Sequence, residues 1–472
     1  MSAALWTSVE AATATGGRST REWNASSVSI DTRTLEQGAL FIALKGERDG
    51  HEFVAESFKR GAAAALVSKK PNDVSDSVPL LVVQDTQAGL EALGRASRAR
   101  TQARIVEVTG SAGKTTTKEM LRLVLTRAGT VAASAASYNN HWGVPLSLAR
   151  MERDTKYGVF EIGMNHEGEI RALVKQVHPH VALVTTIAPA HLEYFGTVEK
   201  IADAKAEIFE GLEPEGTALI PADNSHAERL AKHAREAGVK HILFFGAKAG
   251  ADARLMLAQP DGTGQKVTAE IRGRQVSFRL GAQGYHIAMN AVAALLAANE
   301  LGANVANIAR AMEEFAPLKG RGARFTVLAK TGGIDIIDES YNANPASMVA
   351  ALGLLAAVRP HASGRRIAVL GDMLELGSEA LALHAGLAKD IETANADLVF
   401  LCGPQMAALW QALPSTRKGA YAKNSAELAP QLTGALRAGD IVLVKGSFGS
   451  RMAVIIEALK AFSSNGGGAA AA

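Results

Sequence analysis

The sequence has 472 residues and a single cysteine, Cys402. One cysteine excludes an internal disulfide and a cysteine-rich zinc site, and it is typical of a protein in a reducing compartment. Long apolar runs are also missing, since stretches such as residues 348–358 fall well short of the about 18 residues that span a bilayer. The N-terminus lacks the cationic start and unbroken apolar segment of a signal peptide, because Glu10 interrupts the only candidate. These absences predict a cytoplasmic protein without membrane insertion.

Neither sign of charge is in clear excess. Fifty basic residues oppose 47 acidic ones, which leaves a formal charge of +3. This balance is too even to indicate nucleic acid or an anionic membrane as the main partner, so any basic site must be local. With 47% hydrophobic and 21% charged residues, the chain can bury real cores, which excludes the disordered and fibrous classes.

The length predicts about three domains, because single cores stop growing near roughly 250 to 300 residues. Residues 71–79 and 316–322 are rich in proline, glycine and polar residues and interrupt regular structure. We predict domains at 1–83, 84–318 and 319–472. The middle and last domains alternate β-branched runs with helical patterns, which is typical of α/β folds with parallel sheets, and the first is mixed α/β. The expected strands are 39–44, 64–67, 105–109, 181–186, 241–245, 334–337, 366–370, 398–402 and 441–445.

One segment has the pattern of a phosphate-binding loop between the strand 105–109 and a helix. Its glycines, Gly110 and Gly113, permit the unusual backbone angles that turn successive N–H groups toward a triphosphate. Lys114 would neutralise the β- and γ-phosphates, and the Thr115 hydroxyl would bind magnesium. The alternative is a glycine turn with an exposed lysine, which would not require Gly-Lys-Thr at this junction. The predicted ATP-binding residues of the loop are Thr109, Gly110, Ser111, Ala112, Gly113, Lys114, Thr115 and Thr116.

Polar residues downstream are candidates to complete a magnesium site. Glu161 ends one expected strand and His191 follows another, and such strand ends converge in a parallel sheet. Taken alone, a solvated carboxylate and a satisfied loop histidine are the simpler interpretations. Lys205 lies on an expected amphipathic helix, where a solvated lysine is the default. Asn139 and Asn140 belong to a polar stretch that on general grounds is only a loop.

Several segments together resemble the Mur ligases of peptidoglycan synthesis, and they occur in the same order. The matching segments are residues 109–119, 138–147, 161–170 and 190–196. Within that family, residues 338–345 and 370–377 resemble the ligase that adds D-alanyl-D-alanine to UDP-N-acetylmuramoyl-tripeptide. The resemblance therefore implies a uridine-nucleotide-binding first domain, a central P-loop ATPase domain and a Rossmann-like third domain that binds the dipeptide. It implies ATP-dependent amide bond formation through an acyl phosphate.

The resemblance also implies roles for individual residues. Asn290 should meet the adenine, Arg324 should reach the nucleotide phosphates from the third domain, and Asp338 or Glu339 should approach the ribose. Two further sets complete the expected substrate contacts. For the UDP-linked substrate they are Ser29, Thr32, Arg33, Lys45, His51, Asn139 and Asn140, and for the dipeptide Tyr341, Asn342, Asn344 and Asp372.

The same resemblance implies two magnesium ions and a modified lysine. Thr115 and Glu161 would bind one ion, and His191 and Lys205 the second, with Lys205 at the position of the carbamylated lysine of several Mur ligases. Carbon dioxide would convert the neutral amine into an anionic oxygen ligand that suits Mg²⁺. Lys114, Glu161, His191 and Lys205 are thus the expected catalytic residues.

Other functions remain open at this point. The chain could be a folylpolyglutamate synthase, the Mur ligase that adds diaminopimelate or lysine, a nucleotide-driven switch, or an inactive scaffold. The segments around residues 31–33 and 51 argue against a folylpolyglutamate synthase. Residues 341–345 argue against the Mur ligase that adds diaminopimelate or lysine. A switch would hydrolyse ATP without the dipeptide, and the presence of Lys114, Thr115 and Glu161 argues against a scaffold. We expect a monomer. The sequence does not show whether residue three of the accepted tripeptide is diaminopimelate or lysine.

Overall fold

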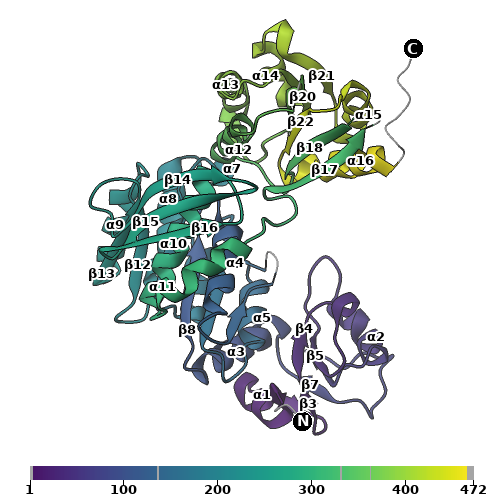
Figure 1. Ribbon diagram of the computed structural model, residues 1–472. Helices are drawn as coiled ribbons and strands as arrows, with labels where there is room; N and C mark the ends of the chain where they lie inside the picture. Colours follow the sequence, from purple (N-terminus) through teal and green to yellow (C-terminus); the bar gives the residue numbers. More distant parts are fainter. Residues whose placement is uncertain (1–3, 136–137, 330–331, 362, 465–472) are drawn as a thin grey trace.

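Three large sheets follow one another along the chain, beside a small two-stranded sheet near the N-terminus, in a computed structural model that describes residues 4–135, 138–329, 332–361 and 363–464. Figure 1 shows the first part in purple at the bottom, the central part in blue to green, and the last part in green to yellow at the top. The three-domain α/β fold that the sequence predicts is confirmed.

The first sheet has five strands in the order β2-β7-β6-β5-β4, and all its pairs are parallel except β2 with β7. Residues 71–79 join β6 to β7, so this stretch is a loop within one sheet. The elements are β1 (Trp6–Thr7), α1 (Ser8–Thr15), β2 (Arg18–Ser19), β3 (Asn24–Ala25), β4 (Ser27–Ser29), β5 (Ala39–Ile42), α2 (Val54–Lys59), β6 (Ala64–Val67) and β7 (Leu80–Val82), with 3₁₀ turns η1 (Thr32–Thr34) and η2 (Gly50–Phe53).

The central sheet has nine strands in the order β16-β15-β14-β13-β12-β11-β8-β10-β9. The strands from β9 to β14 pair in parallel, whereas β14, β15 and β16 pair antiparallel. The strands are β8 (Arg104–Thr109), β9 (Val131–Ala133), β10 (Tyr157–Glu161), β11 (Val181–Val184), β12 (Thr217–Pro221), β13 (His241–Gly246), β14 (Ala253–Asp261), β15 (Gly264–Ile271) and β16 (Arg274–Leu280).

Helices cover this central sheet and connect its parallel strands, as βαβ crossovers require. They are α3 (Thr86–Ala99), α4 (Lys114–Leu125), α5 (Gly143–Ala149), α6 (Glu169–Val177), α7 (Leu192–Phe195), α8 (Val198–Ala206), η3 (Glu207–Gly211), α9 (Ala227–Glu236), α10 (Tyr285–Glu300), α11 (Val305–Ile308) and η4 (Ala309–Glu314). Among the helices with described positions, none is long and apolar enough to cross a membrane.

The third sheet has six strands in the order β17-β18-β22-β19-β20-β21, parallel except for β17 with β18. Its elements are β17 (Ala323–Ala329), β18 (Gly332–Glu339), α12 (Pro345–Ala357), β19 (Arg366–Gly371), η5 (Gly377–Glu379), α13 (Ala380–Thr393), β20 (Leu398–Cys402), α14 (Met406–Ala412), η6 (Ser415–Arg417), β21 (Lys418–Ala422), α15 (Ser425–Ala435), β22 (Ile441–Lys445), η7 (Phe448–Ser450) and α16 (Ala453–Ser464).

Buried apolar side chains join the domains as well as filling them. Trp6 of the first part packs with α3 and α5 and donates its indole N–H to the Ala149 carbonyl at 2.8 Å.

In the third domain, Cys402 is buried beside Met452, and burial raises the pKa of its thiol to about 12. Figure 1 shows α7 and α12 where the central and third domains meet.

Candidate active site

The phosphate loop lies between the end of β8 at Thr109 and the start of α4 at Lys114. Gly110 and Gly113 have φ angles of +144° and +84°, in the region that favours glycine. A side chain at Gly110 would also collide, because its Cβ would lie 1.9 Å from Thr185 Oγ1. The two glycines are therefore required by the loop's backbone, as a triphosphate-binding turn before a helix demands.

Lys114 folds back over its own loop. Its ammonium donates to the Gly110 carbonyl at 2.7 Å. Burial lowers the pKa of Lys114, the Glu161 carboxylate opposes this shift, and Arg321 adds to it. Among the described residues no carboxylate is in direct contact with this ammonium, and a phosphate group would give it such an anionic partner.

Glu161 is buried at the end of β10 and held from two sides. Thr115 Oγ1 donates to Glu161 Oε2 at 2.8 Å, and Asn139 Nδ2 donates to Oε1 at 2.9 Å. The parallel pairing of β10 with β8 places Glu161 next to Val108, directly before the loop. A hydroxyl and a carboxylate in contact are hard oxygen ligands that fit Mg²⁺. Across the described ranges, no three His, Cys, Asp or Glu side chains form a metal cluster, so further ligands would have to come from the nucleotide and water.

His191 and Lys205 line the same cavity as the phosphate loop. The His191 Nδ1 lies 2.5 Å from Glu375 Oε2 of the third domain. Lys205 is 1% exposed on α8, and its ammonium has no hydrogen bond or ion pair with any residue that the structure describes. Burial lowers the pKa of Lys205 well below its ordinary value, and the charge of Lys114 adds to this shift. An amine with a lowered pKa is more often neutral, and a neutral amine is nucleophilic.

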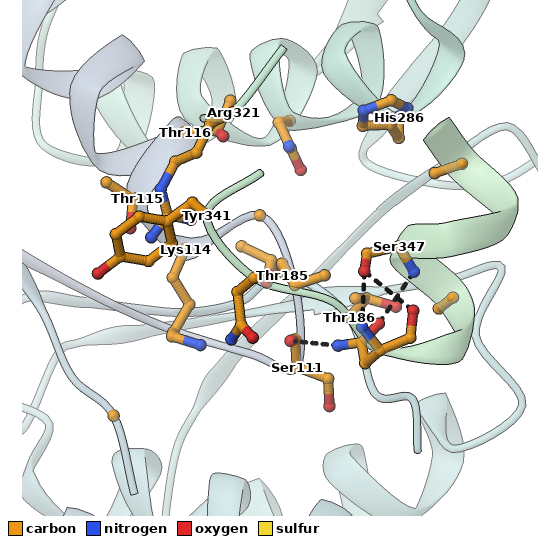
Figure 2. Close-up of a pocket in the computed structure, with 18 of the residues that line it drawn as sticks. Ser111, Lys114, Thr115, Thr116, Thr185, Thr186, His286, Arg321, Tyr341 and Ser347 are labelled. Carbon is orange, nitrogen blue, oxygen red and sulfur yellow. Dashed lines mark hydrogen bonds between the residues drawn. The ribbon is translucent and has the colours of Figure 1, made fainter. Parts of the chain in front are cut away.

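A cavity of about 630 Å³ joins these groups to the third domain. Figure 2 shows Lys114, Thr115 and Thr116 of α4 on the left of the view together with Tyr341 and Arg321, and His286 and Ser347 on the right. The residues predicted from the sequence that line it are Ser111, Ala112, Gly113, Lys114, Thr115, Thr116, Asn139, Asn140, Glu161, His191, Lys205, Asn290, Glu339, Tyr341, Asn342 and Asn344.

Some predicted nucleotide and dipeptide contacts lie elsewhere. Arg324 does not line the cavity and donates to Gln283 Oε1 at 2.9 Å. The Asp338 carboxylate is buried and accepts from the backbone N–H of Gly320 at 3.0 Å, so Glu339 is the member of that pair that faces the cavity. The Asp372 carboxylate accepts the Met406 N–H at 2.9 Å at the start of α14. Asn290, by contrast, lines the cavity and lies against the phosphate loop, with Nδ2 3.0 Å from where a Cβ on Gly113 would be.

The predicted uridine-binding residues of the first domain lie outside this cavity. His51 is buried, with Nδ1 2.6 Å from Asp49 Oδ1 and Nε2 accepting the Ser68 N–H at 2.9 Å. Arg33 is exposed and paired with Asp31 at 2.6 Å. The remaining residues of this set share the same part of the fold: Ser29 ends β4, Thr32 starts η1, and Lys45 pairs with Asp49 in an isolated bridge.

Two cations of the cavity were missed by the sequence analysis. The Arg321 guanidinium lies over the Tyr341 ring, 4.1 Å from its centre. Lys445 ends β22 and donates to the Asn342 carbonyl at 2.9 Å and to Glu339 at 3.4 Å. Lys445 stands at the end of a correctly predicted strand, so the rule that polar residues at strand ends converge could have found it. Arg321 lies in a connecting stretch, and nothing in its pattern indicated the cavity.

Comparison with known proteins gives a consistent result. Family models match the middle domain of Mur ligases at residues 108–298, the Mur ligase glutamate ligase domain at 323–448, and the Mur ligase catalytic domain at 24–109. The UDP-N-acetylmuramoyl-tripeptide–D-alanyl-D-alanine ligase of Rickettsia prowazekii is 32% identical over 453 residues, which cover 96% of this chain and 99% of the relative.

Two solved structures are similar over nearly the whole length. The crystal structure of MurF from Acinetobacter baumannii has a TM-score of 0.83 and 30% identity and covers 97% of this chain and 99% of its own. MurF from Thermotoga maritima in complex with ADP has a TM-score of 0.77 and 25% identity, with coverages of 93% and 98%. The chain belongs to the Mur ligase family. The predicted family is thus confirmed, and the relatives' names agree with the activity predicted from the sequence.

Proposed function

We propose that this protein forms an amide bond between UDP-N-acetylmuramoyl-tripeptide and D-alanyl-D-alanine at the expense of ATP. The observation that carries this proposal is the shared cavity, which the phosphate loop lines from the central domain and residues 341–344 line from the third domain. A nucleotide, a carboxylate and an incoming amine can therefore meet in one cavity. The names of the full-length relatives support the same substrates.

A free carboxylate must gain a leaving group before an amine can replace its oxygen. In the proposed reaction the terminal carboxylate of the tripeptide attacks the γ-phosphate and releases ADP, which leaves an acyl phosphate. The amine of D-alanyl-D-alanine then attacks the acyl carbon, and phosphate departs. Lys114 offsets the negative charge that builds up on the phosphates, and the loop's N–H groups hold the triphosphate in line. Tyr341 and Asn342 of the third domain help to keep water from the acyl phosphate.

Thr115 and Glu161 would hold Mg²⁺, and Asn139 orients the carboxylate. The ion would supply electrostatic stabilisation of the phosphate oxygens during transfer. A second ion would be held by His191 and Lys205, provided that Lys205 carries a carboxylate. Two magnesium ions are what the family resemblance implies, and they are part of this proposal.

Carbamylation of Lys205 has support in the side chain's surroundings. The residue is 1% exposed, and burial and the charge of Lys114 both favour its neutral amine. Carbon dioxide would add to that amine with loss of a proton. We expect ¹³C-labelled bicarbonate to give a carbamate resonance in the purified protein by NMR, and Lys205→Ala to lack it. An identical spectrum for both proteins would contradict the modification.

We also propose that one chain is the active unit, because the phosphate loop and residues 341–344 of a single chain are enough to line the shared cavity. The domain boundaries at 83 and 318, the uridine site in the first domain and a cytoplasmic location are parts of the same proposal. No partner other than the two small-molecule substrates is required by it.

Phosphate release provides the direct test. With ATP, magnesium and UDP-N-acetylmuramoyl-tripeptide, release should be slow without D-alanyl-D-alanine and should rise steeply when the dipeptide is added. Mass spectrometry should show the pentapeptide product. Steady ATP hydrolysis that ignores the dipeptide would indicate a nucleotide switch, and faster release with a folate or with diaminopimelate would indicate another ligase.

A further inference from the structure

Three carbonyl groups of the phosphate loop each accept a hydrogen bond from a different side chain. Lys114 Nζ donates to the Gly110 carbonyl at 2.7 Å, and Thr185 Oγ1 donates to the Ala112 carbonyl at 2.5 Å. The Ser111 carbonyl accepts from Asn344 Nδ2 at 3.0 Å. The first two donors belong to the central domain, whereas Asn344 belongs to the third domain.

A hydrogen bond that holds a carbonyl in place also fixes the direction of the N–H on the other side of the same peptide group. Peptide groups are planar and trans, so the C=O of one residue and the N–H of the next point in opposite directions. The Ser111 and Ala112 carbonyls therefore determine where the Ala112 and Gly113 N–H groups point. Within the described chain, neither N–H has a hydrogen-bond partner, and both residues line the cavity. They are the donors that phosphate oxygens would use.

Asn344 is itself held rigidly at the start of α12. Its Oδ1 accepts the Ser347 N–H at 2.9 Å, and the Ser347 hydroxyl accepts the N–H of Asn344 at 2.9 Å, which forms a capping box. Figure 2 shows Ser347 beside the first turn of the helix and Ser111 below it, with the hydrogen bonds of this junction drawn as dashed lines. The side chain thus uses its oxygen for its own helix and its amide N–H for the other domain. Only an amide side chain of this length supplies both groups.

We propose that Asn344 is a positioning residue that completes the phosphate loop from the third domain. It holds the Ser111 carbonyl and thereby keeps the Ala112 N–H directed at the bound triphosphate. The affinity of the loop for ATP consequently depends on docking of the third domain. A second contact at the same junction, between His191 and Glu375 at 2.5 Å, supports a defined docked arrangement. The catalytic part of this inference rests on the proposed function, but its effect on ATP binding does not.

Serine at position 344 separates the two roles of the asparagine. Serine caps helices about as well as asparagine, but its hydroxyl is too short to cap Ser347 and reach the Ser111 carbonyl as well. For Asn344→Ser we expect an unchanged melting temperature, about tenfold weaker binding of Mg-ATP by calorimetry and a similar rise in the KM for ATP. The KM for the UDP-linked peptide should change by less than about twofold. Asn304→Ser alters a comparable N-cap of α11, whose Oδ1 accepts the Ala306 N–H, and should match wild type throughout.

Two more variants cover the case in which Asn344→Ser is unstable. Asn344→Asp keeps the cap acceptor without the donor and should bind ATP more weakly still, because its charge repels both the carbonyl and the phosphates. Asn344→Thr keeps the cap without adding charge and should behave like the serine variant. Wild-type ATP affinity in any folded variant of this set would overturn the inference. A wild-type protein that binds ATP but forms no pentapeptide would overturn the proposed function alone.

Discussion

At the scale of single residues, Lys114 is the side chain on which phosphate binding depends most directly. Removing it deletes a preorganised positive charge at the site where negative charge develops. Lys114→Ala should therefore lower kcat by about a hundredfold to a thousandfold, equivalent to roughly 3 to 4 kcal/mol of transition-state stabilisation. Phosphate release under saturating substrates measures this loss.

The control for that variant is Lys266→Ala, which removes an exposed lysine from β15. It should leave turnover unchanged. Both variants should melt at the wild-type temperature, because the Lys114 ammonium contributes one hydrogen bond to its own loop. Turnover close to wild type in Lys114→Ala would contradict the assigned role of the loop.

Glu107 is a buried carboxyl group in the middle of the central sheet. It is fully buried in β8, and neither of its oxygens has a hydrogen-bond partner among the side chains and backbone that the structure describes. Burial raises the pKa of Glu107 to about 8. The folded protein therefore keeps the proton that the unfolded chain releases near its ordinary pKa, and stability is lost as the pH rises from about 4.5 toward 8.

Glu107→Gln replaces this carboxyl group by a neutral group of the same shape. The variant should be about as stable as wild type at pH 5 and more stable at pH 8, by on the order of 4 kcal/mol in the free energy of unfolding. Denaturant midpoints at the two pH values measure the difference. Glu270→Gln, at an exposed position of β15, should show no such pH dependence, and parallel curves for wild type and Glu107→Gln would refute the argument.

At the scale of elements, the parallel strands were predictable because they are continuous β-branched runs between helical segments. The expected runs at 105–109, 398–402 and 441–445 correspond to β8, β20 and β22. The antiparallel extension β14 to β16 was not predicted, because its strands mix exposed arginine, glutamine and lysine with their buried residues. Such edge strands are stabilised by their pairing partners, which local sequence does not reveal.

The loop from 371 to 377 is an element whose shape depends on a buried histidine. His384 of α13 accepts the Met373 N–H at Nε2, at 2.9 Å, and its Nδ1 lies 2.6 Å from the Ala380 carbonyl. Glu375 belongs to this loop and contacts His191 of the central domain. His384→Ala should therefore lower the free energy of unfolding by about 2 to 4 kcal/mol, because buried backbone groups lose their partners.

The same variant should raise the KM for the dipeptide, since the loop carries Glu375, which contacts His191 of the cavity. Thermal unfolding and steady-state kinetics measure the two effects. His361→Ala removes an exposed histidine of the same domain and serves as the control. If His384→Ala unfolds like wild type, the loop does not need this histidine for its shape.

At the scale of the whole molecule, the sequence predicts only those parts of the candidate site that lie within a single domain. The phosphate loop, Glu161 and Lys205 follow from local pattern and family resemblance, and they line one cavity. Contacts across the domain junction could not be derived, because they depend on how two separate sheets dock. This is why Arg321 and not the expected Arg324 faces the cavity.

Docking of the third domain also involves the pair formed by His191 and Glu375. Both residues have positive φ angles, +60° and +62°, which hold their side chains in a strained but defined place. The pair is partly exposed, so it should contribute no more than about 1 kcal/mol. Glu375→Gln should raise the KM for the dipeptide by a few fold and shift the scattering profile toward a more extended particle.

Small-angle X-ray scattering with and without nucleotide measures that shift. Glu379→Gln changes an exposed carboxylate only four residues away and should leave both the scattering and the kinetics as in wild type. A Glu375→Gln profile that superposes on wild type under both conditions would show that other contacts hold the domains together.

The buried thiol of Cys402 makes the native chain well suited to optical distance measurements. Because this side chain is enclosed and its pKa is about 12, maleimide dyes should leave it unmodified at neutral pH. Two cysteines introduced on the first and third domains could then carry a donor and an acceptor fluorophore without any replacement in the interior. Energy transfer between them would follow the approach of the outer domains in real time during catalysis.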